Sequence, residues 1–414
     1  MQRENAYDIL KERGFVRQVT DEEGVRRAFE TSQVTTYVGF DPTAKSLHVG
    51  NLLGLMALAH LQRAGHRPIA IIGDGTAMIG DPSGKTELRQ MLTRETISEN
   101  AERIKAQVAR YFTIDGKVGL AVHNATWLLE LNYIEFLREI GRHFSVNRML
   151  SAEAYKIRLE TGLSFLEFNY QILQAYDFLK LYQMYNCTIQ LGGDDQWGNI
   201  VAGIDLIRRV EGVEAYGITW PLLTTAGGLK MGKTAAGAVW LDPEMTSPYE
   251  FYQYWINVDD RDVERFLAYY TFLPLSEVKK LGALQGAEIR EAKEVLAYEA
   301  TKISHGEAEA EKARQASRAA FEGRAEDPSA IPSTTVGVDR LKEGILVVDV
   351  LAEVGLASSK SAARRLIQQG GAYVNQDRID DIEAKIDLED FQNGDVMLRA
   401  GKKRYHRLVV GSKG

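Results

Sequence analysis

The chain has 414 residues, 45% hydrophobic and 26% charged, with a formal net charge of -7 and one cysteine, Cys187. This length exceeds one ordinary core and predicts two or three domains of a soluble globular protein, and the lone cysteine excludes an intrachain disulfide and favours a reducing compartment. No window approaches ~18 uninterrupted apolar residues and the charged segment 1–23 has no apolar core, so we expect a cytoplasmic protein without a membrane span or signal peptide.

The first elements predict the start of an α/β sheet. Residues 5–33 have a loose helical periodicity, and 36–40 are β-branched and aromatic, as in a strand. A turn at 41–43 leads into an apolar helix that runs to Ala64, and 68–73 form a short buried strand. Such a βαβ unit exposes backbone N–H groups at its helix N-terminus, which favours an anion site there.

A glycine-rich stretch, 73–86, follows the second strand and ends in Gly-Lys-Thr. We reject a P-loop, because three residues separate Gly80 from Gly84 where that motif needs four, and the Gly75–Gly80 pair is followed by Asp81 where lysine is required. The stretch is either an ordinary strand-to-helix loop or a loop that lines a ligand.

Helices are expected at about 93–112 and 127–143, with a strand at 118–123 between them. A further helix is expected over 166–185, and its polar residues fall at i, i+4 and i+7: Tyr170, Gln174 and Asp177. On an otherwise apolar helix, such a stripe is either a buried structural network or the wall of a pocket.

A second strand–glycine–helix junction is predicted from a strand at 188–191, a turn at 192–199 and a helix at 200–210. It lies at the carboxyl end of a parallel strand, where open α/β sheets bind ligands. The next strand, 218–223, leads into a glycine-rich loop with Lys230 and Lys233. That loop is either a mobile phosphate clamp or a solvated hairpin tip.

The last part of the chain changes character twice. Residues 247–323 predict an all-helical domain, and 322–338 have little periodicity and predict a linker. The terminal residues 344–414 predict a compact module with a basic helix and a basic strand. This module either contacts a phosphate backbone or presents a solvated charged face.

Several motifs together resemble those of the bacterial tyrosyl-tRNA synthetases, which belong to the class I aminoacyl-tRNA synthetases. The two class signatures, HIGH and KMSKS, are similar to residues 48–51 (His-Val-Gly-Asn) and 230–234 (Lys-Met-Gly-Lys-Thr). The supporting segments are Gly39-Phe40-Asp41-Pro42-Thr43, Gly80-Asp81-Pro82-Ser83-Gly84-Lys85, Gln174-Ala175-Tyr176-Asp177 and Asp195-Gln196-Trp197-Gly198-Asn199.

The resemblance implies a fold and a domain order. We expect a Rossmann-like parallel sheet in an α/β catalytic domain (1–224), then the KMSKS loop and a helical anticodon-binding domain (225–323). A linker (324–343) and a small α+β RNA-binding domain of the S-four type (344–414) complete the chain. The resemblance also implies a homodimer, for which 127–165 is the expected interface.

The resemblance further implies a role for individual residues. The residues that bind tyrosine are Tyr37, Tyr170, Gln174, Asp177, Gln190, Asn124 and Asp81. Those that line ATP or the adenylate are Gly39, Asp41, Thr43, His48, Gly50, Asn51, Asp195, Gln196 and Lys233. The catalytic set that meets the phosphates and the leaving pyrophosphate is Thr43, His48, Asn51, Lys85, Arg89, Lys230 and Lys233. The basic residues expected to bind RNA are Lys360, Arg364, Arg365, Lys402, Lys403 and Arg404.

The implied reaction is that of a tyrosine–tRNA ligase. The enzyme activates L-tyrosine with ATP to tyrosyl-adenylate and pyrophosphate, and then transfers tyrosine to the 3' end of its tRNA. Such chemistry needs positioning and positive charge, but no protein nucleophile. No tightly bound cofactor is expected, only Mg²⁺ that accompanies ATP.

Three departures from the family pattern stand out. Asn51 replaces a histidine that many relatives carry, and it can still donate a hydrogen bond. Gly232 and Thr234 replace serines. Asp194 stands beside Asp195 where a serine is expected, and because two carboxylates near an anionic ligand repel it, we expect Asp194 to point away from the site.

The alternatives are a tryptophanyl-tRNA synthetase, a non-catalytic RNA-binding protein with a synthetase-like fold, and a general nucleotidyltransferase of the same superfamily. Tyr37 with Asp177, and the terminal RNA-binding module, favour tyrosine over tryptophan. The presence of His48, Lys230 and Lys233 argues against a protein without catalysis. The long RNA-binding half argues against a general nucleotidyltransferase.

Overall fold

The computed structural model describes residues 4–83, 92–226, 231, 233–234, 237–322, 331–375, 377–391, 394–401 and 404–411. The chain divides into two compact units, and each is described by itself. Unit 1 contains Met1–Met231, Trp240–Asp242 and Val258–Ala292, and unit 2 contains Gly232–Val239, Pro243–Asn257 and Lys293–Gly414. Within the described ranges, no helix has the length and apolar character needed to cross a membrane.

Unit 1 is built on a six-stranded sheet in the order β1-β6-β5-β2-β3-β4. Its strands are β1 (Gln18–Val19), β2 (Thr35–Phe40), β3 (Arg67–Ile72), β4 (Leu120–His123), β5 (Cys187–Gly193) and β6 (Tyr216–Trp220). Strands β4, β3, β2, β5 and β6 are parallel, and β1 pairs antiparallel with β6 at the edge. The expected parallel sheet is confirmed, with this short antiparallel edge added to it.

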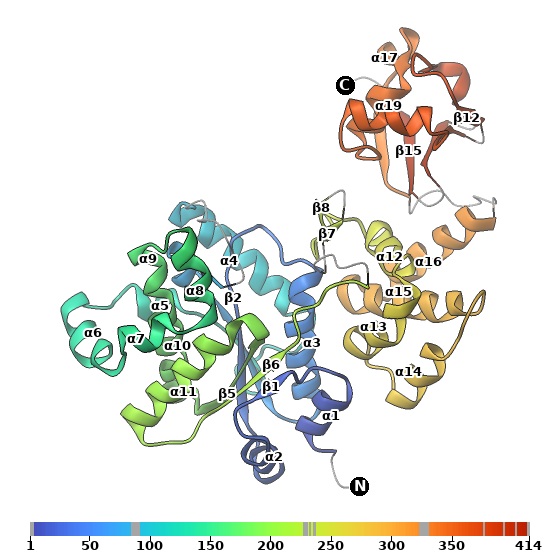
Figure 1. Cartoon of the computed structure of the whole chain (residues 1–414). Helices are drawn as coiled ribbons and strands as arrows, with labels where there is room; N and C mark the ends of the chain where they lie inside the picture. The colour runs from blue at the N-terminus through green and yellow to red at the C-terminus, as the bar shows by residue number, and fades with distance from the viewer. Residues whose placement is uncertain are drawn as a thin grey trace. The chain divides into compact units, whose positions relative to one another are not determined.

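The helices before residue 231 connect and cover these strands. They are α1 (Ala6–Glu12), α2 (Glu22–Thr31), α3 (Val49–Arg63), α4 (Arg94–Val108), α5 (Ala125–Leu128), α6 (Tyr133–Glu139), α7 (Val146–Leu150), α8 (Glu153–Thr161), α9 (Phe165–Phe168), α10 (Tyr170–Tyr185) and α11 (Trp197–Glu211). Three 3₁₀ turns join them: η1 (Thr76–Met78), η2 (Gly141–His143) and η3 (Asp194–Gln196). In Figure 1, α10 and α11 lie on one side of the sheet and α3 on the other.

Local sequence explains the central elements. Strand β3 is an apolar run buried on both faces, as a central parallel strand requires. Helix α3 is almost entirely buried and carries apolar residues on all sides. Helix α10 ends at Asn186, which adopts the left-handed conformation with φ of 53°, a common way to stop a helix.

Helices follow the sheet, and they are shared between the two units. Unit 1 holds η4 (Asp260–Asp262), α13 (Val263–Tyr270) and α14 (Leu275–Gly282), and unit 2 holds α12 (Pro248–Ile256) and α16 (Glu307–Glu322). Helix α15 (Ile289–His305) spans the boundary, and the short strands β7 (Lys233–Thr234) and β8 (Gly237–Ala238) pair in unit 2. The helical segment expected as one domain is therefore divided between two compact units.

The terminal part of unit 2 is a five-stranded sheet, ordered β12-β11-β14-β15-β9, with helices packed on it. Its elements are β9 (Ser333–Gly337), α17 (Val338–Lys342), β10 (Ile345–Leu346), α18 (Val347–Glu353), α19 (Lys360–Gln368), β11 (Ala372–Val374), β12 (Asp377–Ile379), β13 (Lys385–Ile386), η6 (Leu388–Asp390), β14 (Asp395–Ala400) and β15 (Arg404–Gly411). Strand β9 lies inside the segment 324–343 that the sequence predicts as a linker, and it pairs in parallel with β15. The linker prediction is wrong for β9 and α17, because the terminal sheet recruits them.

Candidate active site

The start of α3 is fixed by its own side chains. His48 caps the helix, with Nδ1 accepting from Gly50 N at 3.0 Å, and Asn51 Oδ1 accepts from His48 N at 3.1 Å. Since Nδ1 is an acceptor, the neutral imidazole carries its proton on Nε2. The capping box thus sets the tautomer in which Nε2 can donate to an anion at the helix N-terminus.

Both ends of the predicted lysine loop lie beside the start of α3 in unit 1. Trp240 forms an antiparallel bridge with His48, and the two rings lie 6.1 Å apart. A Cβ atom added at Gly50 would lie 2.7 Å from Cε1 of His48 and 3.3 Å from the carbonyl oxygen of Met231, so glycine allows both to approach closely. The signature residues 48–51 and the ends of the lysine loop are therefore brought together.

A buried carboxylate marks the centre of the site. Asp177, on α10, is 3% exposed and accepts two hydrogen bonds, from Trp127 Nε1 at 2.7 Å and from Asn124 Nδ2 at 2.9 Å. Burial raises the pKa of Asp177 to about 7, against the lowering effect of these two donors and with a further increase from the charges of Asp41 and Asp74.

Two buried polar atoms on the adjacent strands β2 and β5 have no hydrogen-bond partner among the described residues. They are the hydroxyl of Tyr37, which lies close enough to Asp177 to feel its charge, and Oε1 of Gln190, and the two residues are neighbours across the strands. Burial raises the pKa of Tyr37 well above 10, and the charge of Asp177 raises it further. Buried polar groups are usually paired, so the unpaired Tyr37 hydroxyl near the Asp177 carboxylate indicates a place where a polar ligand supplies the missing partner.

The stripe on α10 is joined to the turn after β2. Tyr170 donates its hydroxyl proton to Asp41 Oδ2 at 2.9 Å, and Thr76 donates to Asp41 Oδ1 at 2.8 Å. Asn124 donates to Thr76 Oγ1 at 3.0 Å, so this network reaches the Asp177 carboxylate as well. Tyr170 and Asp177 are thus joined by a buried hydrogen-bond network, the first of the two interpretations that the sequence leaves open.

A second network joins α10 to the turn after β5. Gln196 Nε2 donates to Asp81 Oδ2 at 2.8 Å. Asn199 Nδ2 donates to Gln174 Oε1 at 3.0 Å and to Gln196 Oε1 at 3.1 Å. Four side chains from three segments of the sequence therefore form one connected hydrogen-bond network.

The neighbouring Asp194 has different partners. Its Oδ1 accepts from Gln18 Nε2 at 2.6 Å and from Thr219 Oγ1 at 2.9 Å. These donors lie on β1 and β6, which places the Asp194 side chain against the edge of the sheet. The expectation that Asp194 turns away from the site agrees with these contacts.

The remaining expected residues differ in how the structure places them. Gly39 and Thr43 are exposed near the carboxyl end of β2. Lys85, Arg89, Lys230, Lys402 and Lys403 lie outside the described residues, as does the side chain of Lys233.

Three network members are absent from the sequence-based set: Trp127, Thr76 and Asn199. Trp127 lies three residues after Asn124, a spacing that brings side chains onto one helical face. That spacing could have identified Trp127 from the sequence. Thr76 lies within the glycine-rich stretch 73–86, and Asn199 ends the segment 195–199.

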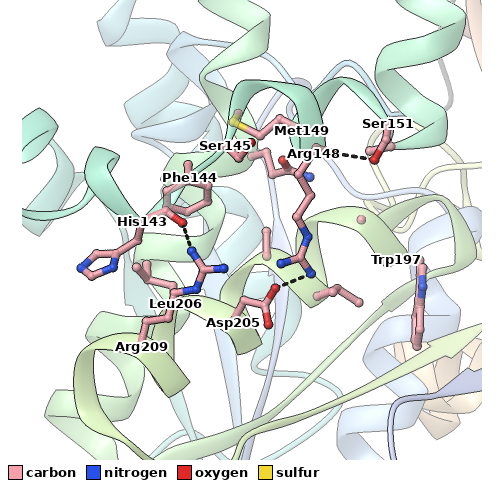
Figure 2. Close-up of a pocket in the computed structure, with 15 residues that line it drawn as sticks. His143, Phe144, Ser145, Arg148, Met149, Ser151, Trp197, Asp205, Leu206 and Arg209 are labelled. Carbon is pink, nitrogen blue, oxygen red and sulfur yellow. Dashed lines mark hydrogen bonds and ion pairs between the residues drawn. The ribbon is translucent and has the colours of Figure 1, made fainter.

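Unit 1 also has an open hollow of about 200 Å³, formed by residues 143–152 and one face of α11. Figure 2 shows Arg148 pointing at Asp205, with an N–O distance of 2.5 Å, and Arg209 pointing at the carbonyl of His143. Apolar side chains on nearby helices are unusually exposed, with Tyr133 at 60%, Ile134 at 69% and Phe165 at 72%.

In the terminal sheet domain, the expected RNA-binding residues are exposed. Lys360, Arg364 and Arg365 lie on α19 and Arg404 starts β15. Lys360 also pairs with Asp349 at 2.9 Å, which reduces the positive charge that it offers to a phosphate.

Comparison with known proteins covers nearly the whole chain. A family model described as tRNA synthetases class I (W and Y) matches residues 30–322, and one described as tyrosine–tRNA ligase SYY-like C-terminal domain matches residues 326–408. The chain is 53% identical to a tyrosine–tRNA ligase of Desulfatibacillum aliphaticivorans, over 99% of each protein. It is 56% identical to one of Clostridium botulinum (strain 657), over 98% of this chain and 99% of the relative.

Solved structures of tyrosyl- and tryptophanyl-tRNA synthetases are also similar to this chain. A C-terminally truncated mitochondrial tyrosyl-tRNA synthetase from Aspergillus nidulans aligns with a TM-score of 0.70 at 30% identity, over 77% of this chain and 95% of the other. A tryptophanyl-tRNA synthetase from Encephalitozoon cuniculi, bound to tryptophan, aligns with a TM-score of 0.56 at 14% identity, which shows a shared fold.

Proposed function

Because the chain belongs to the tyrosine–tRNA ligases of the class I tRNA synthetase family, we propose that the side chains gathered at the carboxyl edge of its sheet activate tyrosine. The observation that carries this proposal is the buried pair of Asp177, with its pKa of about 7, and the unpartnered hydroxyl of Tyr37. The phenol hydroxyl of the substrate donates to the Asp177 carboxylate and accepts from Tyr37. Phenylalanine cannot do either: it would leave the buried Tyr37 hydroxyl unpaired and would give the Asp177 carboxylate no donor beyond Asn124 and Trp127.

The ammonium end of tyrosine needs acceptors at the other end of the pocket. Asp81 and Gln174 supply oxygens from the second network, and Tyr170 supplies its phenol oxygen. The unpaired Oε1 of Gln190 is a further acceptor. The substrate is therefore held at both ends, and its carboxylate is directed toward the start of α3.

Adenylate formation requires the tyrosine carboxylate to attack the α-phosphorus of ATP while pyrophosphate leaves. His48 Nε2 and the Asn51 side-chain amide would donate to the phosphates, at the positive end of the α3 dipole. Gly39, Asp41, Thr43, Gly50, Asp195 and Gln196 would line the nucleotide. Lys85, Arg89, Lys230 and Lys233 would offset the charge of the leaving pyrophosphate, and ATP would arrive with Mg²⁺.

The RNA-binding roles follow the order of the chain. We assign recognition of the anticodon region to the helices between 243 and 322, and contacts with tRNA phosphates to the terminal sheet domain. Arg364, Arg365 and Arg404 are exposed there, so binding would weaken with salt. Lys402 and Lys403, which lie outside the described residues, are assigned the same role.

We also propose a homodimer and a cytoplasmic location. The side chains of Tyr133, Ile134 and Phe165 are 60–72% exposed, and several large exposed hydrophobic side chains within the segment 127–165 favour an interaction surface. A second copy would cover them, together with the hollow in Figure 2. This matches the expected interface at 127–165.

The test is amino-acid-dependent exchange of labelled pyrophosphate into ATP. We expect exchange with L-tyrosine, far less with L-phenylalanine, and none with L-tryptophan. Asp177→Ala should remove the exchange driven by tyrosine, with the fold retained. Exchange that depends on tryptophan, or a fully active Asp177→Ala enzyme, would contradict the proposed site.

A further inference from the structure

A histidine and an aspartate form a pair behind the proposed tyrosine site, on the last two strands of the parallel sheet. His123 ends β4, and Asp74 follows the neighbouring strand β3. The distance from His123 Nδ1 to Asp74 Oδ2 is 2.9 Å, and the two side chains are 22% and 14% exposed. Neither residue belongs to the set assigned to the substrates above.

The other oxygen of Asp74 holds the backbone on both sides of the pair. Oδ1 accepts from Ala125 N at 2.9 Å and from Gly75 N at 3.1 Å. These two amides flank Asn124, one from the next residue in the chain and one from the facing loop. The carboxylate of Asp74 therefore ties the glycine-rich loop to the start of α5.

These hydrogen bonds from Gly75 and Ala125 to Asp74 fix the orientation of the Asn124 side-chain amide. Gly75 N also donates to Asn124 Oδ1 at 2.8 Å, which commits that oxygen. Nδ2 must then point the other way, where it donates to Asp177 Oδ2 at 2.9 Å and to Thr76 at 3.0 Å. A rotation of the amide would direct an oxygen at the Asp177 carboxylate, which is repulsive.

His123 donates to Asp74 in either of its charge states. Around Nε2, the structure places Glu102 at 3.5 Å and Lys105 at 3.4 Å, both on α4. In the neutral ring with its proton on Nδ1, Nε2 accepts from Lys105, and in the charged ring it donates to Glu102. Both arrangements keep the Nδ1 proton on the Asp74 side.

We propose that His123 is a positioning residue for recognition of the substrate hydroxyl: it holds Asp74, and through Asp74 it keeps the Asn124 amide directed at Asp177. This rests on the proposed role of Asp177. Without His123, the Asp74 carboxylate loses the donor on Oδ2 and is held only by the Gly75 and Ala125 amides on Oδ1, so it can turn about those two bonds. Its charge, which already disfavours ionisation of Asp177, then faces one donor fewer.

The test is steady-state pyrophosphate exchange by the full-length enzyme and its His123→Ala, His123→Asn and Glu102→Gln variants. Asparagine places a neutral N–H donor near the position of Nδ1, and Glu102→Gln changes only the outer side of the ring. We expect His123→Ala to raise KM for tyrosine about tenfold, the equivalent of one lost hydrogen bond, with kcat and KM for ATP within about twofold. It should also reduce the preference for tyrosine over phenylalanine.

His123→Asn should restore most of the tyrosine affinity, and Glu102→Gln should match the wild type. If His123→Ala does not fold, as judged by its thermal unfolding, His123→Leu replaces it, because leucine fills the space without a donor. An unchanged KM for tyrosine in the Ala or Leu variant overturns the proposal, as does an equal loss in kcat and KM for ATP or a failure of asparagine to rescue. No tyrosine-dependent exchange by the wild type would instead contradict the proposed function.

Discussion

At the scale of single residues, the site contains buried polar groups whose loss of hydration is only partly offset by hydrogen bonds within the protein. Tyr37 is 2% exposed and its hydroxyl has no partner among the described residues. Asp177 has two donors, yet its pKa still lies about three units above that of an exposed aspartate. Both buried groups lower the stability of the protein without tyrosine. A bound phenol hydroxyl would form hydrogen bonds with both of them.

Replacing Tyr37 with phenylalanine tests whether the unpaired hydroxyl destabilises the protein. Because the hydroxyl is buried and unpaired, Tyr37→Phe should leave the free energy of unfolding unchanged or raise it by up to ~1 kcal/mol. The same change should lower the preference for tyrosine over phenylalanine in pyrophosphate exchange. Urea unfolding and competitive exchange measure the two effects. A large loss of stability would show that the hydroxyl has a structural partner.

The raised pKa of Asp177 predicts how stability depends on pH. Between about pH 4 and 7 the folded protein keeps a proton on Asp177 that the unfolded chain has released. Stability therefore falls as pH rises, by about 1.4 kcal/mol per pH unit for this group. Asp177→Asn does not titrate, so from pH 5 to 7 the wild type should lose roughly 2 to 3 kcal/mol relative to the variant.

Urea unfolding of both proteins without tyrosine, at pH 5, 6, 7 and 8, measures that difference. The curves should converge or cross between pH 5 and 7 and run parallel above it. Curves that are parallel throughout would mean that Asp177 ionises normally. Exchange activity of Asp177→Asn should be lost at every pH.

How far the sequence predicts the site can be judged from particular residues. The spacing of Tyr170, Gln174 and Asp177 predicts one shared face of a helix, which the structure confirms. The same periodicity cannot show that Asn124 and Trp127, some 50 residues earlier, donate to Asp177, because that contact depends on the order of the strands. Their meeting depends on the tertiary fold, in which α10, the helix before β5, packs beside the segment that follows β4.

At the scale of elements, the structure differs from the predicted segments mainly where strands pair with distant strands. Sequence periodicity does not predict such pairing. Residues 5–33 have a helical pattern, yet β1 interrupts it, because Gln18 and Val19 pair with β6. The helix expected over 166–185 begins earlier, at Phe165, where Ser164 and Glu167 form a capping box, and it is divided into α9 and α10 at Asn169. Strand β9 likewise exists because β15 offers it an edge.

Asp194, in η3, accepts hydrogen bonds from β1 and β6, and its replacement tests whether these bonds contribute to stability and to ATP binding. Asp194→Ala leaves the donors of Gln18 and Thr219 without an acceptor, so we expect a loss of ~1 to 2 kcal/mol in stability. Because Asp195 and Gln196 continue the same turn, KM for ATP should rise more than KM for tyrosine. Steady-state exchange separates the two constants.

The control is a double-mutant cycle with Gln18→Ala. If the two side chains act through their shared hydrogen bond, their effects on stability should differ from additivity by about 0.5 to 1 kcal/mol. Strict additivity would mean that Asp194 is held by other contacts. The donor on Thr219 gives the same test from β6 through Thr219→Val.

At the scale of the whole molecule, motif order predicts the order of functions but not the compact units. The signature segments 48–51 and the ends of the lysine loop lie far apart in the sequence, and the bridge between His48 and Trp240 joins them. The helical segment predicted as one domain is shared between two units, since α13 and α14 pack with the sheet unit. Helical periodicity identifies such helices without showing which core they join.

The exposed apolar surface of unit 1 gives the last prediction, which concerns assembly. Phe165 is 72% exposed, and a charge at that position would face the apolar surface of a second copy if the protein is a dimer. The wild type should sediment at about twice the chain mass of 46.3 kDa, and Phe165→Asp should shift toward one chain mass. Met184→Asp, at a residue 53% exposed on α10 outside the expected interface, is the matched control and should remain dimeric. Sedimentation at several concentrations decides between these outcomes: a monomeric wild type, or an unaffected Phe165→Asp variant, would exclude the surface around Phe165 as the interface.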